Sequence, residues 1–477
     1  MPTPNPFPPQ PSDSTARERA RAHAHDLATF VEASPSSFHA AHEVARRLVA
    51  AGFTRLEETA AWPGAGDDGA AGGRYVVVRD GAVIAWVVPP GATTTTPFAI
   101  LGAHTDSPGF TLKPRPSVVR EGWWQAGVEV YGGPLLNSWL DRELELAGRV
   151  VVGDGTGPDD VRLVRTGPLL RIPQLAIHLD RAANDGLALD KQQHTQPVWG
   201  LASASGPAGS GDVVGHDGAD DGRTAGADVL AELAHHAGVR ASEITGYDVV
   251  VADTQAPRVF GARDAFLASG RLDNLLSVHA GLTALLEVAA SGADDARDTA
   301  PTTIPVLAAF DHEEIGSQSR SGASGPFLAD VLARVAAGLG ATEEERHRQL
   351  AASLCVSSDV GHSVHPNYPE RHDPVNRPLA GGGPILKINA NQRYSTDALG
   401  AAAWARACAA AGVPSQEFVS RNTVPCGSTI GPLTATRLGI RVVDVGVPLL
   451  SMHSARELTA VVDPWYLTRA VVEVFRG

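Results

Sequence analysis

Residues 304–316, IPVLAAFDHEEIG, place an apolar run directly before a group of charged and polar side chains. The run Ile304–Phe310 is typical of a strand buried on both faces. It ends in Asp311 and His312, and the carboxylates of Glu313 and Glu314 follow at once. Two adjacent carboxylates at the end of a buried strand repel each other and lose hydration unless cations are bound there. The stretch therefore predicts a strand that delivers acidic side chains to a cation site.

Strands and helices alternate on both sides of this stretch. Before it, two helices broken at residues 34–36 precede strand-like runs at 75–78, 83–88 and 98–101. Helical spacing occurs at 275–290, just before this stretch, and at 327–337, 395–411 and 464–475 after it. Strand-like runs occur after it at 354–357, 416–420 and 440–445. This pattern predicts an α/β fold in which helices cover a sheet.

The pattern changes between residues 113 and 256. Strand-like pieces at 128–131, 148–152 and 161–164 alternate with turns there, without long amphipathic helices. We predict an inserted, mainly β domain over 113–256, with a mobile loop near 200–226 where Gly, Ala, Asp and Ser dominate. The α/β domain is then discontinuous and consists of 15–112 and 257–477, while the Pro-rich residues 1–14 form a flexible tail.

Composition excludes several classes of protein. The chain has 477 residues and 43% hydrophobic residues, enough for two domains with substantial cores. Its net charge of −14, from 39 basic and 53 acidic residues, argues against a nucleic-acid partner. No run approaches the roughly 18 apolar residues of a membrane span, and the N-terminus lacks the layout of a signal peptide. The three cysteines are scattered, which fits a reducing compartment, so we predict a cytoplasmic protein without a membrane partner.

Several segments share one arrangement with the stretch at 304–316. Each places acidic or His side chains directly after a strand or at the start of a helix, where open α/β sheets build their sites. Alone, such a residue is more often a cap or a turn residue than a ligand. The segments are 103–107 (AHTDS), 271–274 (RLDN), 311–316 (DHEEIG), 358–362 (SDVGH) and 451–454 (SMHS).

Together these segments hold the ligand inventory of a site for two metal ions. Two His, two Asp and one Glu supply three ligands to each zinc ion if one Asp bridges, and Mn or Co would also be accepted. Two ions roughly 3.5–4 Å apart can clamp both an attacking water and a substrate oxygen. The remaining Glu then serves as the general base. Asp106, two residues after His104, is placed to hold the other ring nitrogen of that His.

The ordered motifs resemble those of the aspartyl aminopeptidase family, two-zinc aminopeptidases that form dodecamers. The resemblance covers nearly everything from about residue 18 onward. The motifs that carry it are 104–109 (HTDSPG), 131–133 (YGG), 139–142 (WLDR), 172–178 (IPQLAIH), 271–274 (RLDN), 311–317 (DHEEIGS), 358–359 (SD), 365–368 (HPNY), 427–432 (GSTIGP) and 451–454 (SMHS).

The resemblance assigns a role to each member of the inventory. It implies a three-layer αβα zinc-peptidase domain with an inserted dimerisation domain. One zinc ion is bound through His104 and Asp359, the other through Glu314 and His453, and Asp273 bridges them. Glu313 matches the general base, which lets a bridging water or hydroxide attack the scissile carbonyl, and Asp106 matches the carboxylate behind His104. The resemblance also implies a cis peptide between Asp273 and Asn274.

Substrate preference and assembly depend on two further residues. Lys387 matches the residue that reads an acidic N-terminal side chain, which implies removal of Asp or Glu from peptides; alone, it reads as a surface Lys ending a strand. His178 alternates to one face of a predicted strand and by itself is a structural histidine. The resemblance implies instead that it reaches the active site of a neighbouring subunit, in dimers assembled into a dodecamer.

Two other functions share most of these features. A broad or neutral aminopeptidase, a deacylase or a carboxypeptidase would keep the sheet and the metal ligands and differ only in the pocket. An inactive assembly or carrier protein could be built on the same fold. The complete ligand set and the intact Glu313 speak against the second, because losing one of them is the simplest route to an inactive enzyme.

Overall fold

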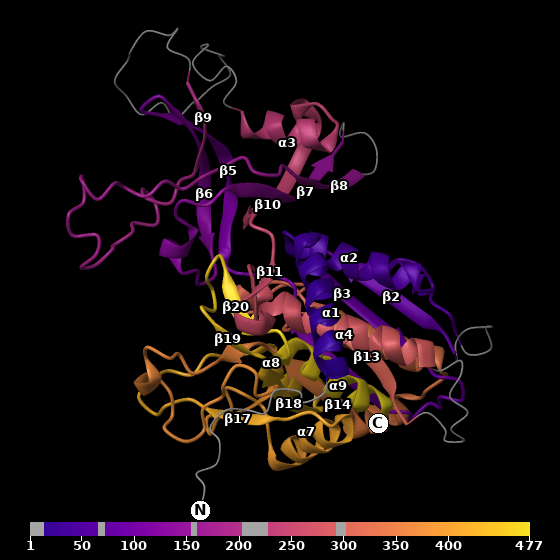
Figure 1. The fold of residues 1–477 in the computed structure, drawn as a ribbon. Coiled ribbons are helices and arrows are strands. Elements are labelled where there is room, and N and C mark those ends of the chain that lie inside the picture. Colours follow the sequence, from indigo (N-terminus) through magenta and orange to yellow (C-terminus); the bar gives the residue numbers. More distant parts are fainter. Residues whose placement is uncertain (1–13, 65–71, 154–159, 203–227, 292–301) are drawn as a thin grey trace, which may run out of the picture. The chain divides into compact units, whose positions relative to one another are not determined.

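The computed structural model describes residues 14–64, 72–153, 160–202, 228–291 and 302–477, which form two compact units (Figure 1). The first unit comprises Met1–Asp106, Pro257–Met452 and Glu457–Gly477, and the second comprises Ser107–Ala256 and His453–Arg456. The first boundary lies after residue 106 rather than 112, because β5 (Gly109–Arg120) is one continuous strand that the predicted boundary would cut. The predicted tail and most of the predicted loop near 200–226 lie outside the described residues.

A nine-stranded mixed sheet forms the centre of the first unit. Its strands, in the order in which they lie side by side, are β1 (Thr54–Arg55), β2 (Arg74–Arg79), β3 (Ala82–Val87), β13 (Ile304–Phe310), β4 (Phe98–His104), β14 (Leu354–Ser358), β18 (Arg441–Gly446), β16 (Ile385–Ile388) and β17 (Gln416–Val419).

Helices cover both faces of this sheet, which confirms the predicted three-layer αβα architecture. Successive residues of β13 and β4 alternate between two separate cores; Leu307 and Leu101 pack into one, while Val306 and Ile100 pack into the other. The first core is closed by α1 (Ser14–Glu32), α2 (Ser37–Ala50), α4 (Leu272–Ser291), α7 (Ala398–Ala411) and α9 (Asp463–Arg476). The second is closed by α5 (Phe327–Gly338), α6 (Glu343–Ala352) and α8 (Ile430–Leu438).

Three parallel central strands end at the same edge of the sheet. In the ladder between β13 and β4, Phe310 lies opposite His104, and in the ladder between β14 and β4, Ser357 lies opposite Gly102. The residues that follow these strands therefore meet at the carboxyl edge of the sheet. This register places the residues that follow these strands close together.

The helix α4 passes one test for a membrane span by its length and hydropathy, but 67% of its most apolar window is buried inside the protein. The helices α1, α9 and the central sheet surround it. The buried core helix of an α/β protein passes the same test, and the position of α4 fits such a helix. Its first turn is irregular, because Asp273 and Asn274 have non-helical torsion angles, and the peptide between them is cis, as the resemblance predicts.

A five-stranded sheet also belongs to the first unit, in the order β11 (Arg258–Phe260), β12 (Phe266–Ser269), β20 (Glu457–Ala460), β19 (Pro448–Leu450) and β15 (Gly361–His362). It was not expected, because strands this short give little periodicity to read. Its strand β20 carries a buried carboxylate, Glu457, that bears on the site described below.

The second unit is built around a six-stranded antiparallel sheet, as its mainly β sequence indicates. The strands lie in the order β8 (Asp160–Arg165), β7 (Leu144–Val152), β10 (Ile244–Asp253), β5, β6 (Trp123–Tyr131) and β9 (Val198–Leu201). The helix α3 (Val229–Ala237) packs Val229 and Leu233 into the core of this unit. Asp228 caps its N-terminus and Gly238, at a positive φ of 68°, ends it.

The strand predicted around His178 is absent. Residues 177–179 form a turn, and His178 is exposed. The alternation of Leu175, Ile177 and Leu179 suggests a half-buried strand, yet these side chains are 57%, 44% and 75% exposed. The apolar residues have no core to cover within the described part of this chain, so the prediction of a strand was wrong.

Two buried histidines make the first unit sensitive to acid. His23 on α1 and His279 on α4 lie with ring centroids 4.8 Å apart, and His279 Nε2 lies 2.7 Å from Asp26 Oδ2. Burial, reinforced by His279, lowers the pKa of His23 to about 3, and burial also lowers the pKa of His279. Asp26 partly offsets both shifts. The neutral rings are therefore stable above the ordinary histidine pKa, and stability is lost as the pH falls from about 6.5 toward 3.

Lowering the pH from 7 to 5 should reduce the free energy of unfolding of the parent chain, and we predict that this reduction is about 2 kcal/mol smaller in His23→Gln. Urea denaturation at pH 7 and at pH 5 measures the free energy of unfolding of each protein. The control is His25→Gln, which changes an exposed His on the same helix and should leave the pH dependence unchanged. An equal loss in His23→Gln and the parent chain would contradict the prediction.

Candidate metal centre

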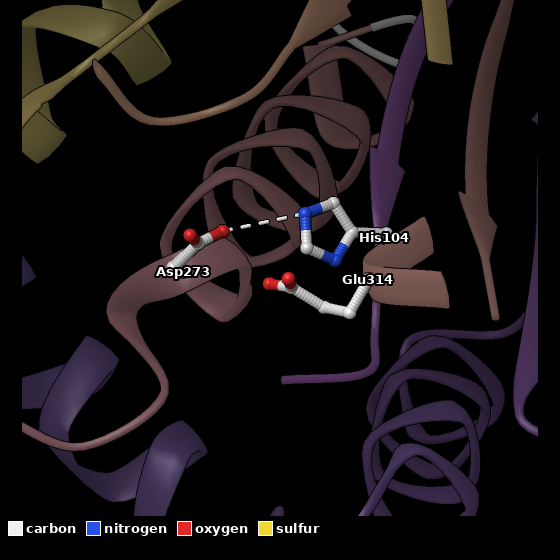
Figure 2. Close-up of side chains that lie close together, drawn as sticks. All are labelled: His104, Asp273 and Glu314. Atoms are coloured by element: carbon white, nitrogen blue, oxygen red, sulfur yellow. Dashed lines mark ion pairs between the residues drawn. The ribbon is translucent and has the colours of Figure 1, made fainter. Parts of the chain in front are cut away.

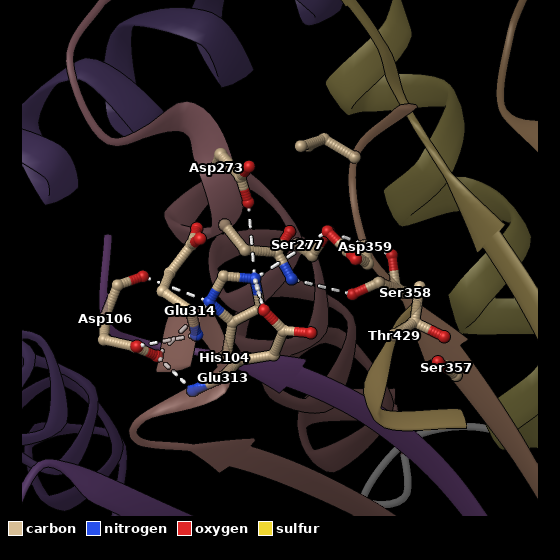
Figure 3. Close-up of polar contacts among 12 residues, drawn as sticks. His104, Asp106, Asp273, Ser277, Glu313, Glu314, Ser357, Ser358, Asp359 and Thr429 are labelled. Atoms are coloured by element: carbon tan, nitrogen blue, oxygen red, sulfur yellow. Dashed lines mark hydrogen bonds and ion pairs between the residues drawn. The ribbon is translucent and has the colours of Figure 1, made fainter. Parts of the chain in front are cut away.

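His104, the last residue of β4, lies at the centre of a buried group of carboxylates (Figures 2 and 3). Its side chain is only 1% exposed. Its Nε2 atom lies 3.3 Å from Asp273 Oδ1, 3.7 Å from Asp359 Oδ1 and 4.0 Å from Glu313 Oε2. The structure thus brings together residues from three strand ends and one helix start, as the segment pattern predicts.

The two nitrogens of His104 face different surroundings. Its Nδ1 lies 3.0 Å from the main-chain oxygen of Asp106 and 3.4 Å from Asp106 Oδ1, so Nδ1 carries the proton and donates it. Its Nε2, which has no hydrogen-bond partner among the described residues, directs a lone pair toward carboxylate oxygens. Lone pairs that face one another in a buried site call for a positive charge between them.

Electrostatics in the site agree with that requirement. Burial opposes protonation of His104, but the carboxylates of Asp106, Asp273 and Asp359 outweigh it and raise the pKa of His104 well above the usual range. Burial, with the neighbouring Asp359, raises the pKa of Glu313 to about 7. Burial and Asp273 raise the pKa of Glu314 well above the usual range. A bound cation would reverse the shifts of the two Glu side chains and favour their ionised forms.

A tight turn presents Glu313 and Glu314. His312 adopts a left-handed conformation at φ 62°, and the single turn η4 (Glu313–Ile315) follows. The carboxylate of Asp106 accepts the main-chain N–H groups of Glu313 at 3.0 Å and of Glu314 at 3.1 Å (Figure 3). Asp106 therefore orients both His104 and the acidic turn, which extends the role predicted for it.

Asp273 approaches His104 from the start of α4. Its own N–H donates to Glu457 Oε2 at 2.9 Å. The next side chain, Asn274, donates from Nδ2 to the main-chain oxygen of Ser358 at 2.9 Å. Ser358 directly precedes Asp359, so this contact joins the segments of two predicted metal ligands.

The residues present fit a metal ion. His104, Asp273 and Glu314 each offer one ligand atom, and these atoms lie within 4.8 Å of one another (Figure 2). Imidazole and carboxylate are the ligands of catalytic zinc. The acceptor-only surroundings of His104 Nε2 and the crowding of buried carboxylates are the observations that favour a cation over an empty polar pocket.

Lys387 lies on β16 beside the same group and is only 2% exposed, so the alternative of a surface lysine is wrong. Its Nζ donates to the main-chain oxygen of Val360 at 2.8 Å and lies 3.8 Å from Asp359 Oδ2. The ring of Tyr394 lies 5.4 Å from Nζ. A buried ammonium group is thus held next to a predicted metal ligand.

Two predicted residues belong to the second unit. His453 has a positive φ of 65°, and its Nδ1 lies 3.0 Å from the main-chain oxygen of Gly133. That contact leaves Nε2 as the ring atom for a metal, and the ligand role of His453 stays a prediction. His178 lies in the exposed turn described above, and its role likewise stays a prediction.

Sequence reasoning missed two residues that the structure places at the site. Tyr394 faces Lys387, and Glu457 holds the N–H of Asp273. Glu457 follows the SMHS motif by three residues, which gave a weak signal. Tyr394 lies four positions before the first residue of α7, and no spacing in the sequence links it to the ligands.

The three-layer fold and a buried His–carboxylate cluster at the carboxyl edge of its sheet define a metal-dependent hydrolase of the α/β class. The chain belongs to the M18 peptidase family: the model of that family, described as aminopeptidase I zinc metalloprotease (M18), matches residues 30–475.

Relatives and solved structures agree with this assignment. A probable M18 family aminopeptidase 2 of Streptomyces avermitilis is 53% identical over 454 residues, which cover 95% of this chain and 97% of the relative. One from Mycobacterium tuberculosis is 42% identical over 443 residues, covering 92% and 94%. A chain in the cryo-EM structure of the Ape4 and Nbr1 complex is 34% identical with a TM-score of 0.88, covering 98% of this chain and 87% of that one. A chain of the S. cerevisiae mApe1 dodecamer is 27% identical with a TM-score of 0.78, covering 96% and 97%. The chain is therefore an aminopeptidase of the zinc-dependent M18 type.

Proposed function

We propose that this chain removes N-terminal Asp or Glu residues from peptides with the help of two zinc ions. His104 and Asp359 would hold one ion, Glu314 and His453 the other, and Asp273 would bridge them. The observation that carries the proposal is the buried ammonium of Lys387, 3.8 Å from Asp359 Oδ2. It places a cation for an acidic side chain beside the predicted ligands of the first unit.

The side chains divide the chemistry among them. Zinc, when bound, polarises the scissile carbonyl and lowers the pKa of water toward neutrality. Glu313 accepts the proton of the attacking water and passes it to the leaving amine. Asp106 keeps the Glu313–Glu314 turn in place through both main-chain N–H groups. Lys387 pairs with the carboxylate of the first substrate residue and so fixes which peptides are bound in register for cleavage.

We also propose that the protein works as a homo-oligomer in the cytoplasm. The exposed Leu175, Ile177 and Leu179 form an apolar stretch around His178, of the kind that another subunit covers. The S. cerevisiae relative is a dodecamer. Light scattering of the purified protein tests the proposal, and an active, stable monomer would contradict it.

Metal removal tests the proposed activity directly. After treatment with EDTA and dialysis, we expect cleavage of Asp-nitroanilide to fall to background, because Glu313 alone cannot make water a sufficient nucleophile. Zn, Mn or Co is then added back to separate samples, and metal content is measured by mass spectrometry. EDTA saturated with zinc is the control. Full activity in protein shown to be metal-free would contradict the metal-dependent mechanism.

A further inference from the structure

Glu457 is a buried carboxylate next to the metal cluster for which the proposed function has no use. It is the first residue of β20 and is only 2% exposed. In the sheet its strand partner is Ser269 of β12, which leads through two residues into α4. Burying a carboxylate is costly, so a buried Glu that accepts a hydrogen bond from a functional segment points to a role for that bond.

Glu457 Oε2 accepts a hydrogen bond from the main-chain N–H of Asp273, at 2.9 Å. Asp273 is the second residue of α4, where an N–H has no carbonyl of a preceding turn to bond. The torsion angles of Asp273 are φ −79° and ψ 102°, outside the helical region. The hydrogen bonds of the helix do not fix this residue, so the direction of its side chain depends on contacts with other elements.

The residue after Asp273 is held as well. Asn274 donates from its side chain to the main-chain oxygen of Ser358, on β14. Hydrogen bonds to β20 and β14 therefore hold Asp273 and Asn274 respectively. In this position Asp273 Oδ1 lies 3.3 Å from His104 Nε2. Displacing the backbone on the β20 side would carry the carboxylate away from the position at which it faces His104.

We propose that Glu457 is a positioning residue that sets the affinity for zinc through the hydrogen bond it accepts from the backbone of Asp273. This inference rests on the metal site of the proposed function. Glu457 acts on the ligand and not on the metal. What matters is an acceptor oxygen at the right reach, because the N–H of Asp273 needs a partner; the negative charge of Glu457 is secondary.

Two conservative variants separate reach from charge. Glu457→Gln loses the charge and keeps an acceptor oxygen at the same reach. Glu457→Asp keeps the charge and, being one methylene shorter, withdraws the oxygen from the N–H of Asp273. Zinc affinity of the metal-free protein is measured by competition with a chromophoric chelator, and the melting temperature of the metal-free protein is measured alongside.

We expect Glu457→Asp to weaken zinc binding about 10- to 100-fold, the usual effect of losing a group that orients a ligand, and Glu457→Gln to stay within about threefold of the parent chain. Glu145 offers matched controls, because it is equally buried, accepts the N–H of Gly167 at 3.2 Å and belongs to the second unit. Glu145→Asp and Glu145→Gln should lower the melting temperature of the metal-free protein without changing zinc affinity.

Three results would overturn the inference. Unchanged zinc affinity in Glu457→Asp would show that the bond does not position Asp273. A loss in Glu457→Gln as large as that in Glu457→Asp would assign the effect to charge. A loss in the Glu145 variants equal to that in Glu457→Asp would assign it to general destabilisation. If the parent chain itself binds no zinc, the metal site of the proposed function fails and the inference fails with it. If the parent chain binds zinc and one of the three results above is found, the inference alone fails.

Discussion

Glu313→Gln should reduce turnover of Asp-nitroanilide by about 10²- to 10⁴-fold while zinc remains bound. Glu313 Oε2 lies 4.0 Å from His104 Nε2, at the edge of the cluster, so it is near the reacting water without being needed as a ligand. Gln has the same size but cannot accept the proton of water. The loss should therefore fall on kcat, because substrate binding depends on other groups.

A metal analysis and a control variant make this test specific. Metal content must be that of the parent chain, since a loss of zinc would place Glu313 among the ligands. Glu344→Gln, which changes an exposed Glu on α6 paired with Arg348 at 3.1 Å, is the control and should leave activity unchanged. A Glu313→Gln protein that keeps zinc and parental kcat would exclude Glu313 as the general base.

The strand ends are the part of the site that sequence alone could predict. A buried apolar run followed at once by Glu313 and Glu314 predicts both the strand and a positive charge beside the two carboxylates. The parallel register of β13, β4 and β14 then places Asp359 and His104 at the same edge. Helices predicted at 275–290 and 464–475 match α4 and α9 to within a turn, because each has an unbroken apolar face.

What the sequence does not contain is the set of contacts between distant segments. Nothing in the spacing links Glu457 to Asp273, 184 positions apart, because their bond depends on how β20 pairs with β12. The helix α6 has little apolar face and is fixed instead by a capping box between Thr342 and Glu345, so periodicity alone missed it. At His178 the period-two pattern indicated a strand, since an apolar surface without a core in its own chain carries the same pattern as a buried face.

Lys387→Met should remove the preference for acidic N-terminal residues, with kcat/KM for Asp-nitroanilide falling about 10²-fold or more and that for Leu-nitroanilide changing little. The ammonium has three donors. In this structure one is used by the main-chain oxygen of Val360 and the group also pairs with Asp359, so donor capacity remains for a substrate carboxylate. Removing one partner of a buried, hydrogen-bonded charge pair costs on the order of 2–4 kcal/mol, which sets the size of the expected change.

The comparison of two substrates distinguishes a direct role from an indirect one. Because Lys387 Nζ lies 3.8 Å from Asp359 Oδ2, its loss could also disturb a metal ligand, but that disturbance would slow both substrates equally. A selective loss on Asp-nitroanilide places the ammonium against the substrate. Lys191→Met is the control, because Lys191 is exposed in the second unit and should change neither rate. An unchanged ratio of the two rates in Lys387→Met would refute the proposed acidic specificity, and the metal-dependent aminopeptidase activity would stand without it.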